Sequence, residues 1–119
     1  MIEKLLIVDD HPAVCQWLRL VLRPLVRSFC ESSDGAEAVQ TYAEQQPDWV
    51  VMDIDMKPMD GLTATRLIKR QFPEARIVLM TGHEDPIFRL AAIEVGAAHF
   101  LFKEDLWQVR KILAGGSAN

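Results

Sequence analysis

The chain contains 119 residues, of which 50% are hydrophobic and 25% charged, and its formal net charge at pH 7 is -4. This length and composition are typical of one globular domain with a substantial core. The negative charge argues against direct binding to nucleic acid, whose phosphate backbone selects basic surfaces. No apolar stretch approaches the roughly 20 residues that span a bilayer, so we expect no membrane association.

The first predicted strand is an apolar run, residues 5–8, that ends on the acidic pair Asp9 and Asp10. A helix is expected to follow, because Pro12 suits the first turn of a helix. This helix ends before Pro24, since proline interrupts helical hydrogen bonding.

A second strand and a second helix come next. Residues 26–32 are less apolar than the first run and predict a strand nearer the edge of the sheet. Ser33 or Asp34 is expected to cap a helix that Pro47 closes. The following apolar run, residues 49–52, ends on Asp53 and predicts a third strand.

The second half of the chain continues this alternation. The remaining expected elements are a helix over 61–72, a strand over 77–80 ending on Thr81, a helix over 86–95 stopped by Gly96, a strand over 100–102 ending on Lys103, and a short last helix over 104–114. We expect the domain to span residues 1–114. Residues 115–119 have the composition of a flexible tail or of a linker that continues into a longer chain.

The continuous apolar runs favour an α/β fold. Runs of this length are typical of parallel strands buried on both faces. Strands that alternate with helices of about ten residues build right-handed βαβ units. Five such units fit the length, so the sequence predicts one doubly wound domain. In such a sheet, ligands bind at the edge where the carboxyl ends of the strands meet.

Polar residues follow the apolar runs at that edge. We therefore expect the carboxylates of Asp9, Asp10 and Asp53 to share one crevice with Thr81 and Lys103. At an effective dielectric constant of about 20, two like charges about 4 Å apart repel by roughly 4 kcal/mol. Either one carboxylate is protonated or a cation lies among them, and Mg²⁺ prefers such oxygen ligands. The expected ligands of this ion are Asp10, Asp53, the backbone carbonyl of Asp55 and, through a water, Asp9.

The same crevice predicts phosphoryl chemistry. A carboxylate can act as a nucleophile toward phosphorus, as in aspartyl-phosphate formation. Asp53 is the expected nucleophile and phosphoacceptor. Lys103 supplies positive charge to the phosphoryl oxygens, and Thr81 supplies a hydroxyl donor.

This order of residues resembles the receiver domain of two-component response regulators. The matching positions are Asp9, Asp10, Asp53, Met56, Pro58, Met59, Asp60, Gly61, Thr81 and Lys103, and they extend over essentially the whole chain. The resemblance implies a flavodoxin-like fold with five parallel strands in the order 2-1-3-4-5. It also implies that Asp53 accepts a phosphoryl group from a histidine kinase or a phosphotransfer protein, with Mg²⁺ required, and that the domain is not a turnover enzyme.

The resemblance also implies a switch and partners. In the family a threonine moves toward the phosphoryl group and an aromatic residue rotates with it, roles that fall on Thr81 and Phe100. Residues 8–12 and the pair Lys103 and Glu104 resemble the subfamily whose receivers precede a helix-turn-helix output domain. The implied partners are the kinase, an output domain or downstream protein, and a second copy in a homodimer.

Three residues near the expected site are candidates for tuning its chemistry. Lys57 stands where receivers usually carry a proline and adds a cation beside the site. Asp55 lies two residues beyond the acceptor, and His83 lies two residues beyond the threonine. His11 is expected to be a surface residue at the start of the first helix.

The cysteine and tryptophan residues predict features of the packing. Cys15 and Cys30 form no CxxC pair and are expected to be buried free thiols, which fits the reducing cytoplasm. Trp17 and Trp49 are expected in the core. Trp107, on the short last helix, is expected to be partly exposed.

Two other functions compete with the receiver interpretation. Residues 50–55 resemble the strand and DxD signature of haloacid-dehalogenase phosphatases, in which the second aspartate is a general acid. In that class, however, the acidic pair follows the lysine, and a cap segment is present. The second alternative is a receiver-like module that docks without phosphorylation, although every chemical position of a receiver is present here.

Overall fold

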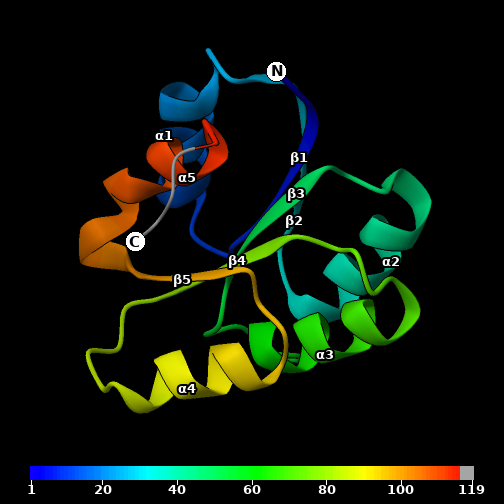
Figure 1. Cartoon of the computed structure of the whole chain (residues 1–119), viewed down its shortest axis with the longest axis vertical. Helices are drawn as coiled ribbons and strands as arrows, with labels where there is room; N and C mark the ends of the chain where they lie inside the picture. Colours follow the sequence, from blue (N-terminus) through cyan, green and yellow to red (C-terminus); the bar gives the residue numbers. More distant parts are fainter. Residues whose placement is uncertain (116–119) are drawn as a thin grey trace.

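The protein, described here by a computed structural model of residues 1–115, contains one five-stranded parallel sheet. The strands are β1 (Ile2–Val8), β2 (Val26–Ser32), β3 (Trp49–Asp53), β4 (Ile77–Thr81) and β5 (His99–Phe102). They lie in the order β2-β1-β3-β4-β5 (Figure 1), which confirms the predicted fold class and sheet order. The less apolar β2 occupies an edge, as predicted.

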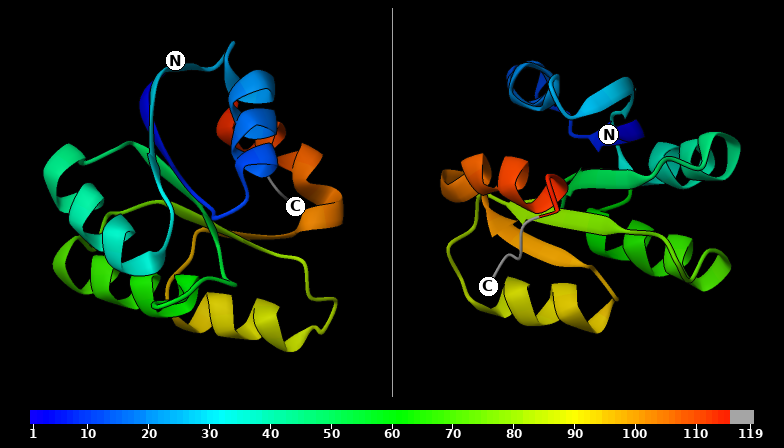
Figure 2. Two further views of the ribbon diagram at one scale, coloured as in Figure 1. Left: turned by 180° about the vertical axis from the view of Figure 1, so that it is seen from behind. Right: turned by 45° about the horizontal axis from the view of Figure 1, so that its top comes forward.

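Helices cover both faces of the sheet. They are α1 (Pro12–Leu22), α2 (Gly35–Gln45), α3 (Gly61–Gln71), α4 (Ile87–Glu94), the 3-10 helix η1 (Lys103–Gln108) and α5 (Val109–Leu113). Figure 2 shows α1 and α5 on one face and α2, α3 and α4 on the other. This arrangement explains why the four strands other than the edge strand β2 contain runs of successive apolar residues instead of alternating with polar ones.

The side chains of β1 divide between two hydrophobic clusters. Leu5 and Ile7 pack with residues of α1 and α5, whereas Leu6 and Val8 pack with residues of α2 and α3. All four side chains are fully buried. The central strands are therefore held from both sides, and their carboxyl ends have little freedom to move apart.

Local capping explains where two of the helices begin. Of the two predicted caps for α2, the structure selects Asp34, whose side chain accepts a hydrogen bond from the backbone N–H of Glu37. Asp60 caps α3 by accepting from the N–H of Thr63 at 2.7 Å. Gly61 follows directly, and a Cβ there would overlap the backbone carbonyl of Asp53. The start of α3 thus packs against the end of β3 with no space for a side chain.

The predicted single last helix over 104–114 is wrong in its form. The chain instead forms the 3-10 helix η1, within which the backbone angles of Asp105 are not helical. It then forms only five residues of α-helix, in α5. Leu106, Val109 and Ile112 are all buried, at intervals of three residues. Leu106 belongs to the 3-10 helix and Val109 and Ile112 belong to α5, so both short helices bury one side against the sheet.

The packing predictions need three corrections, for Trp17, Cys30 and Trp49. Trp17 is 37% exposed, because the buried side of α1 is formed by Cys15, Leu18 and Leu22. Cys30 is only half-buried, although both cysteines are free as predicted. Trp107 is exposed, which agrees with its prediction.

Trp49 is also only partly buried, because it lies on the outer part of its cluster. Its ring lies against that of His99, with ring centroids 6.0 Å apart. None of the helices in residues 1–115 combines the length and the hydropathy needed to cross a bilayer. Of the predicted tail, residues 116–119 lie outside the described part of the chain, so that prediction stays open.

Candidate functional site

Four neighbouring strand ends bring the predicted site residues to one edge of the sheet. β3 ends on Asp53 and β4 on Thr81, while Asp9 follows β1 and Lys103 follows β5. Asp9, Asp53 and Thr81 are buried, which is unusual for polar side chains and requires partners. Because these residues follow adjacent parallel strands, the sheet itself sets their spacing.

Lys103 lies between the two buried carboxylates. Its Nζ is 3.0 Å from Asp9 Oδ2 and 3.3 Å from Asp53 Oδ2. Burial works to lower the pKa of Lys103, but its contact with Asp9 and the attraction of Asp53 outweigh burial, and the pKa lies above its ordinary value. Lys103 is therefore a cation at neutral pH, held against the carboxylates of Asp9 and Asp53.

Burial has the larger effect on Asp53. The side chain has no solvent exposure, and burial together with the negative charge of Asp9 raises the pKa of Asp53 from 3.8 to about 6, against the opposing effect of Lys103. Its Oδ1 accepts a hydrogen bond from the backbone N–H of Asp55 at 3.2 Å. At pH 7 Asp53 is mainly ionised, and its charge is poorly solvated.

His11 is a site residue that the sequence prediction missed. Its ring Nδ1 lies 2.8 Å from Asp9 Oδ1 and 2.9 Å from Asp10 Oδ1, and its backbone N–H also donates to Asp9 Oδ1. The hydrogen bond with Asp9, helped by the charges of Asp9 and Asp10, raises the pKa of His11. The ring is exposed as predicted, but it turns back over the acidic pair. A histidine between two aspartates and a helix-starting proline was the signal that could have indicated this.

Asp55, Thr81 and His83 form a second group at the entrance of the site. The Thr81 hydroxyl donates to Asp55 Oδ2 at 2.9 Å, and His83 Nε2 lies 3.0 Å from Asp55 Oδ1. The backbone N–H of His83 donates to the Thr81 hydroxyl oxygen at 3.1 Å. Asp55 therefore binds both residues with its side chain, which lies where a residue that tunes the site, as predicted for Asp55 beside its backbone role, could act.

The acidic group has the composition of a cation site. One ligand atom from each of Asp9, Asp10, His11 and Asp53 lies within 4.8 Å of the others. Asp9 Oδ2 and Asp53 Oδ2 are buried, and among residues 1–115 their polar partner is the shared Lys103 ammonium, so neither carboxylate oxygen has a full set of hydrogen bonds. Buried carboxylate oxygens with free lone pairs fit a hard divalent cation such as Mg²⁺, which takes oxygen ligands.

An open cavity of about 500 Å³ leads toward these residues. It is lined by Asp10, Ile54, Asp55, Met56, Lys57, Asp60, Leu62 and Phe88. Lys57 is exposed on its rim, and the peptide bond between Lys57 and Pro58 is cis. The Lys57 ammonium is the cation that was predicted beside the site, and it lies at the entrance of this cavity. Its charge is opposite to that of the aspartates in the lining.

Phe100, the other predicted switch residue, lies on the α4 side of the sheet. It is 9% exposed and contacts Phe102 edge to face, with ring centroids 5.1 Å apart. In the register of β4 and β5, Leu79 lies beside Phe100 and Thr81 beside Phe102. Phe102 is therefore the neighbour of Thr81 in the sheet and is also in ring contact with Phe100, so it lies between the two predicted switch residues.

A doubly wound sheet with an acidic cluster, a threonine and a lysine at its carboxyl edge defines the class of domain, and comparison with known proteins identifies the family. A family model described as "response regulator receiver domain" matches residues 5–114. The chain belongs to this family and is a receiver domain of two-component response regulators. The phosphatase interpretation is not favoured.

Individual relatives agree with this assignment. The chain is 35% identical over 102 residues to the transcriptional regulatory protein LiaR of Bacillus subtilis, covering 84% of this chain and 48% of LiaR. It is 34% identical over 108 residues to the chemotaxis protein CheY of the same species, covering 87% of each chain. The chain spans about half the length of the transcriptional regulators that it matches.

Solved structures give the same picture of the fold. A LuxR-family two-component response regulator from Aurantimonas sp. superposes with a TM-score of 0.83 and 36% identity, covering 95% of this chain and 86% of that one. Residues 8–12 resemble those of receivers that precede a helix-turn-helix output domain. Together with this match, the resemblance supports the assignment of the chain to that subfamily of receivers.

Proposed function

We propose that Asp53 is the phosphoacceptor of this receiver domain and that Lys103 and Thr81 assist the transfer. The observation that carries this proposal is the position of the Lys103 ammonium, which contacts both Asp53 and Asp9 at the carboxyl edge of the sheet. A buried carboxylate with a cation 3.3 Å away is a poorly solvated nucleophile beside fixed positive charge. Phosphoryl transfer requires mainly such alignment and charge.

The transfer step forms one bond and breaks one. An Asp53 carboxylate oxygen forms an O–P bond while the N–P bond of the donor's phosphohistidine breaks, and the leaving imidazole takes up a proton from solvent. Lys103 then pairs with a phosphoryl oxygen in place of part of its contact with Asp53. Thr81 gives up its hydrogen bond to Asp55 and donates to another phosphoryl oxygen.

The proposed Mg²⁺ ligands are Asp10, Asp53 and the backbone carbonyl of Asp55, with Asp9 acting through a water. Asp9 Oδ2 and Asp53 Oδ2 support this assignment, because both are buried and share only the Lys103 ammonium as a polar partner. When bound, the ion supplies positive charge against the phosphoryl oxygens. Asp9 itself is oriented by His11 through Oδ1, which leaves Oδ2 facing Lys103 and the acceptor.

The proposed partners follow from the family. The donor is a histidine kinase or a phosphotransfer protein, and the phosphorylated surface acts on an output domain or on a downstream protein, with a homodimer as one form. We propose no direct contact with nucleic acid by this domain, in keeping with its net charge of -4. A cytoplasmic location fits the two free thiols, Cys15 and Cys30.

Intact-mass measurement after incubation with acetyl phosphate and Mg²⁺ tests the proposal. The wild-type protein should gain one phosphoryl group, and Asp53→Asn should gain none. Glu44→Gln is the matched control, because it removes one exposed carboxylate on α2, away from the site. Modification of Asp53→Asn to the wild-type extent would overturn the assignment of the acceptor.

A turnover assay separates the proposal from phosphatase activity. With p-nitrophenyl phosphate as substrate, a receiver should release no more than about one product per protein before slow self-dephosphorylation limits it. Many cycles per minute, lost in Asp53→Asn, would instead identify a phosphatase. Chelation of Mg²⁺ should abolish the acetyl phosphate reaction, because like charges at the site then repel the donor.

A further inference from the structure

The ring of His11 lies over the acidic pair that follows β1. Its Nδ1 is 2.8 Å from Asp9 Oδ1 and 2.9 Å from Asp10 Oδ1. One ring nitrogen therefore has an oxygen from each of two carboxylates at hydrogen-bonding distance, although it can carry only one hydrogen. The proposed Mg²⁺ site makes no use of this nitrogen, because Mg²⁺ takes oxygen ligands.

The spacing of these three atoms suits one shared ion. Ligand atoms about 2.1 Å from an ion lie about 3.0 Å apart at right angles and about 3.4 Å apart at the tetrahedral angle. The two contacts of the His11 nitrogen are shorter than these separations by a fraction of an ångström. An ion in place of the ring hydrogen therefore needs only small movements of the three side chains.

Asp9 is a second, independent sign of a cation at this position. Its side chain is fully buried, and its Oδ2 has only the Lys103 ammonium, shared with Asp53, as a polar partner among residues 1–115. Its Oδ1 accepts the backbone N–H of His11 and has a second lone pair that faces the His11 ring. A buried carboxylate with an incomplete set of hydrogen bonds is costly, and a bound cation removes part of that cost.

The other two ligand groups are open to solvent. The side chains of His11 and Asp10 are 63% and 50% exposed. An ion can therefore reach the three atoms without any movement of the core, and water fills the coordination positions that the protein leaves open. Three protein ligands and a water are the arrangement of open zinc sites.

A nitrogen ligand changes the class of ion that such a group prefers. Carboxylates suit Mg²⁺, Ca²⁺ and Mn²⁺, whereas imidazole suits Zn²⁺ and its neighbours in the first transition row. We propose that His11 Nδ1, with carboxylate oxygens of Asp9 and Asp10, forms a binding site for Zn²⁺. Zn²⁺ bound there occupies Asp10, a proposed ligand of Mg²⁺, so the two ions compete. This inference concerns the ion alone and does not require that Asp53 accept a phosphoryl group.

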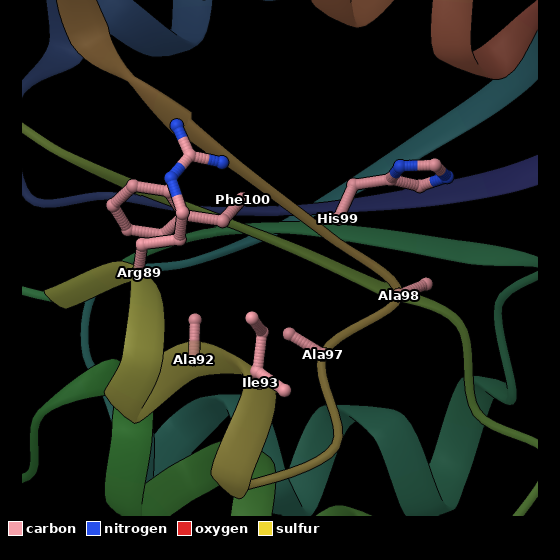
Figure 3. A pocket seen from close by; sticks show the side chains of 7 residues that line it. All are labelled: Arg89, Ala92, Ile93, Ala97, Ala98, His99 and Phe100. Carbon is pink, nitrogen blue, oxygen red and sulfur yellow. The ribbon is translucent and has the colours of Figure 1, made fainter. Parts of the chain in front are cut away.

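His99 provides a histidine without such neighbours. Figure 3 shows it on β5, beside the cavity of about 290 Å³ between α4 and β5, with its ring directed away from Arg89. No carboxylate lines this cavity, and the Arg89 guanidinium lies over the Phe100 ring, 5.2 Å from its centroid. The His99 ring lies against Trp49 and takes part in no ion pair among residues 1–115. A change at His99 therefore removes one imidazole without touching the acidic group.

Calorimetric titrations with Zn²⁺ and, separately, with Mg²⁺ test the proposal on the wild type, His11→Gln and His99→Gln. Glutamine keeps a hydrogen-bond donor near Asp9 but lacks the imidazole that Zn²⁺ prefers. Removing a group that only orients a metal ligand already costs about 10- to 100-fold in affinity, so loss of a ligand should weaken Zn²⁺ binding by at least about tenfold in His11→Gln. His99→Gln should bind Zn²⁺ as the wild type does, and Mg²⁺ affinity should fall in neither variant.

Two results of these titrations would overturn the proposal. Unchanged Zn²⁺ affinity in His11→Gln would show that the ring is not a ligand. An equal loss of Zn²⁺ and Mg²⁺ affinity would show that His11 only orients Asp9 for any cation. A loss of Zn²⁺ affinity alone supports the nitrogen ligand.

A second measurement identifies the ligand directly. In ring-nitrogen NMR spectra of the wild type, a stoichiometric amount of Zn²⁺ should shift the Nδ1 signal of His11 and leave the signals of His83 and His99 in place. A shift at His83 in place of His11 would put the ion beside Asp55 and overturn the proposal.

Mg²⁺-dependent phosphorylation by acetyl phosphate, measured on the same proteins, keeps the two proposals separate. Zn²⁺ binding through His11 in a wild-type protein that is not phosphorylated would overturn the proposed function of Asp53 and leave the zinc site standing. Phosphorylation of a wild-type protein whose Zn²⁺ binding does not depend on His11 would do the reverse.

Discussion

The Thr81 hydroxyl donates a hydrogen bond to Asp55 Oδ2 at 2.9 Å, although the two residues are 26 positions apart in the chain. His83 reinforces this contact, because its ring binds the other oxygen of the same carboxylate. Thr81 is therefore occupied before any phosphoryl group arrives. In the proposed function, a phosphoryl group on Asp53 therefore has to compete with Asp55 for the hydroxyl.

We predict that Asp55→Asn accelerates phosphorylation of Asp53 by acetyl phosphate. The substitution removes a negative charge from the path of an anionic donor and weakens the acceptor of the Thr81 hydrogen bond. An effect of about 1 kcal/mol, or roughly fivefold in rate, is expected for a half-exposed charge. The rate is measured by intact mass over time, with Glu74→Gln, an exposed site on the α3–β4 connection, as the control. An unchanged rate in Asp55→Asn would count against this role.

Lys103 should contribute to folding as well as to transfer. In Lys103→Met, the buried carboxylates of Asp9 and Asp53 lose the cation between them, and breaking a buried ion pair in this way costs about 3 kcal/mol or more. Urea unfolding at neutral pH measures the loss, with the exposed Lys111→Met of α5 as the control. Added Mg²⁺ should restore part of the stability by binding the same oxygens. Equal stabilities of the two variants would show that the contacts of Lys103 are energetically neutral.

The raised pKa of Asp53 predicts a pH dependence of stability. Between 3.8 and about 6 the folded protein keeps a proton on Asp53 that the unfolded chain releases, so the free energy of unfolding falls as the pH rises through this window. The full difference corresponds to roughly 3 kcal/mol. Asp53→Asn cannot titrate there, so its stability relative to the wild type should increase from about pH 4 to about pH 7. Parallel curves for the two proteins in urea titrations would refute the raised pKa.

Gly61→Ala should destabilise the domain because α3 begins against the end of β3. The new Cβ would overlap the carbonyl oxygen of Asp53, so either the strand end or the helix must shift. Forced overpacking of this kind costs about 2 to 3 kcal/mol. Gly82→Ala is the matched control, since nothing lies within 4 Å of a Cβ there. Thermal unfolding of both variants checks the prediction, and a Gly61→Ala protein as stable as Gly82→Ala would contradict it.

The positions of the main site residues could be predicted because they depend on local pattern. Short apolar runs mark the strands, and the residue after each run lies at the carboxyl edge whatever its neighbours are. Asp9, Asp53, Thr81 and Lys103 were therefore expected together and are found together. The divided last helix was not predicted, since helix type there depends on which side chains find space in the core.

The amino-acid sequence by itself determined the α/β alternation, the strand ends and the chemical groups placed on them, because these follow from periodicity and chain direction alone. Only the tertiary structure decided which of those groups touch. The binding of Thr81 by Asp55 and the position of Arg89 over Phe100 each depend on a side-chain rotamer chosen by neighbours from other elements. Rotamers are separated by small energies that packing and charge across the fold decide, so no local pattern in the sequence encodes them.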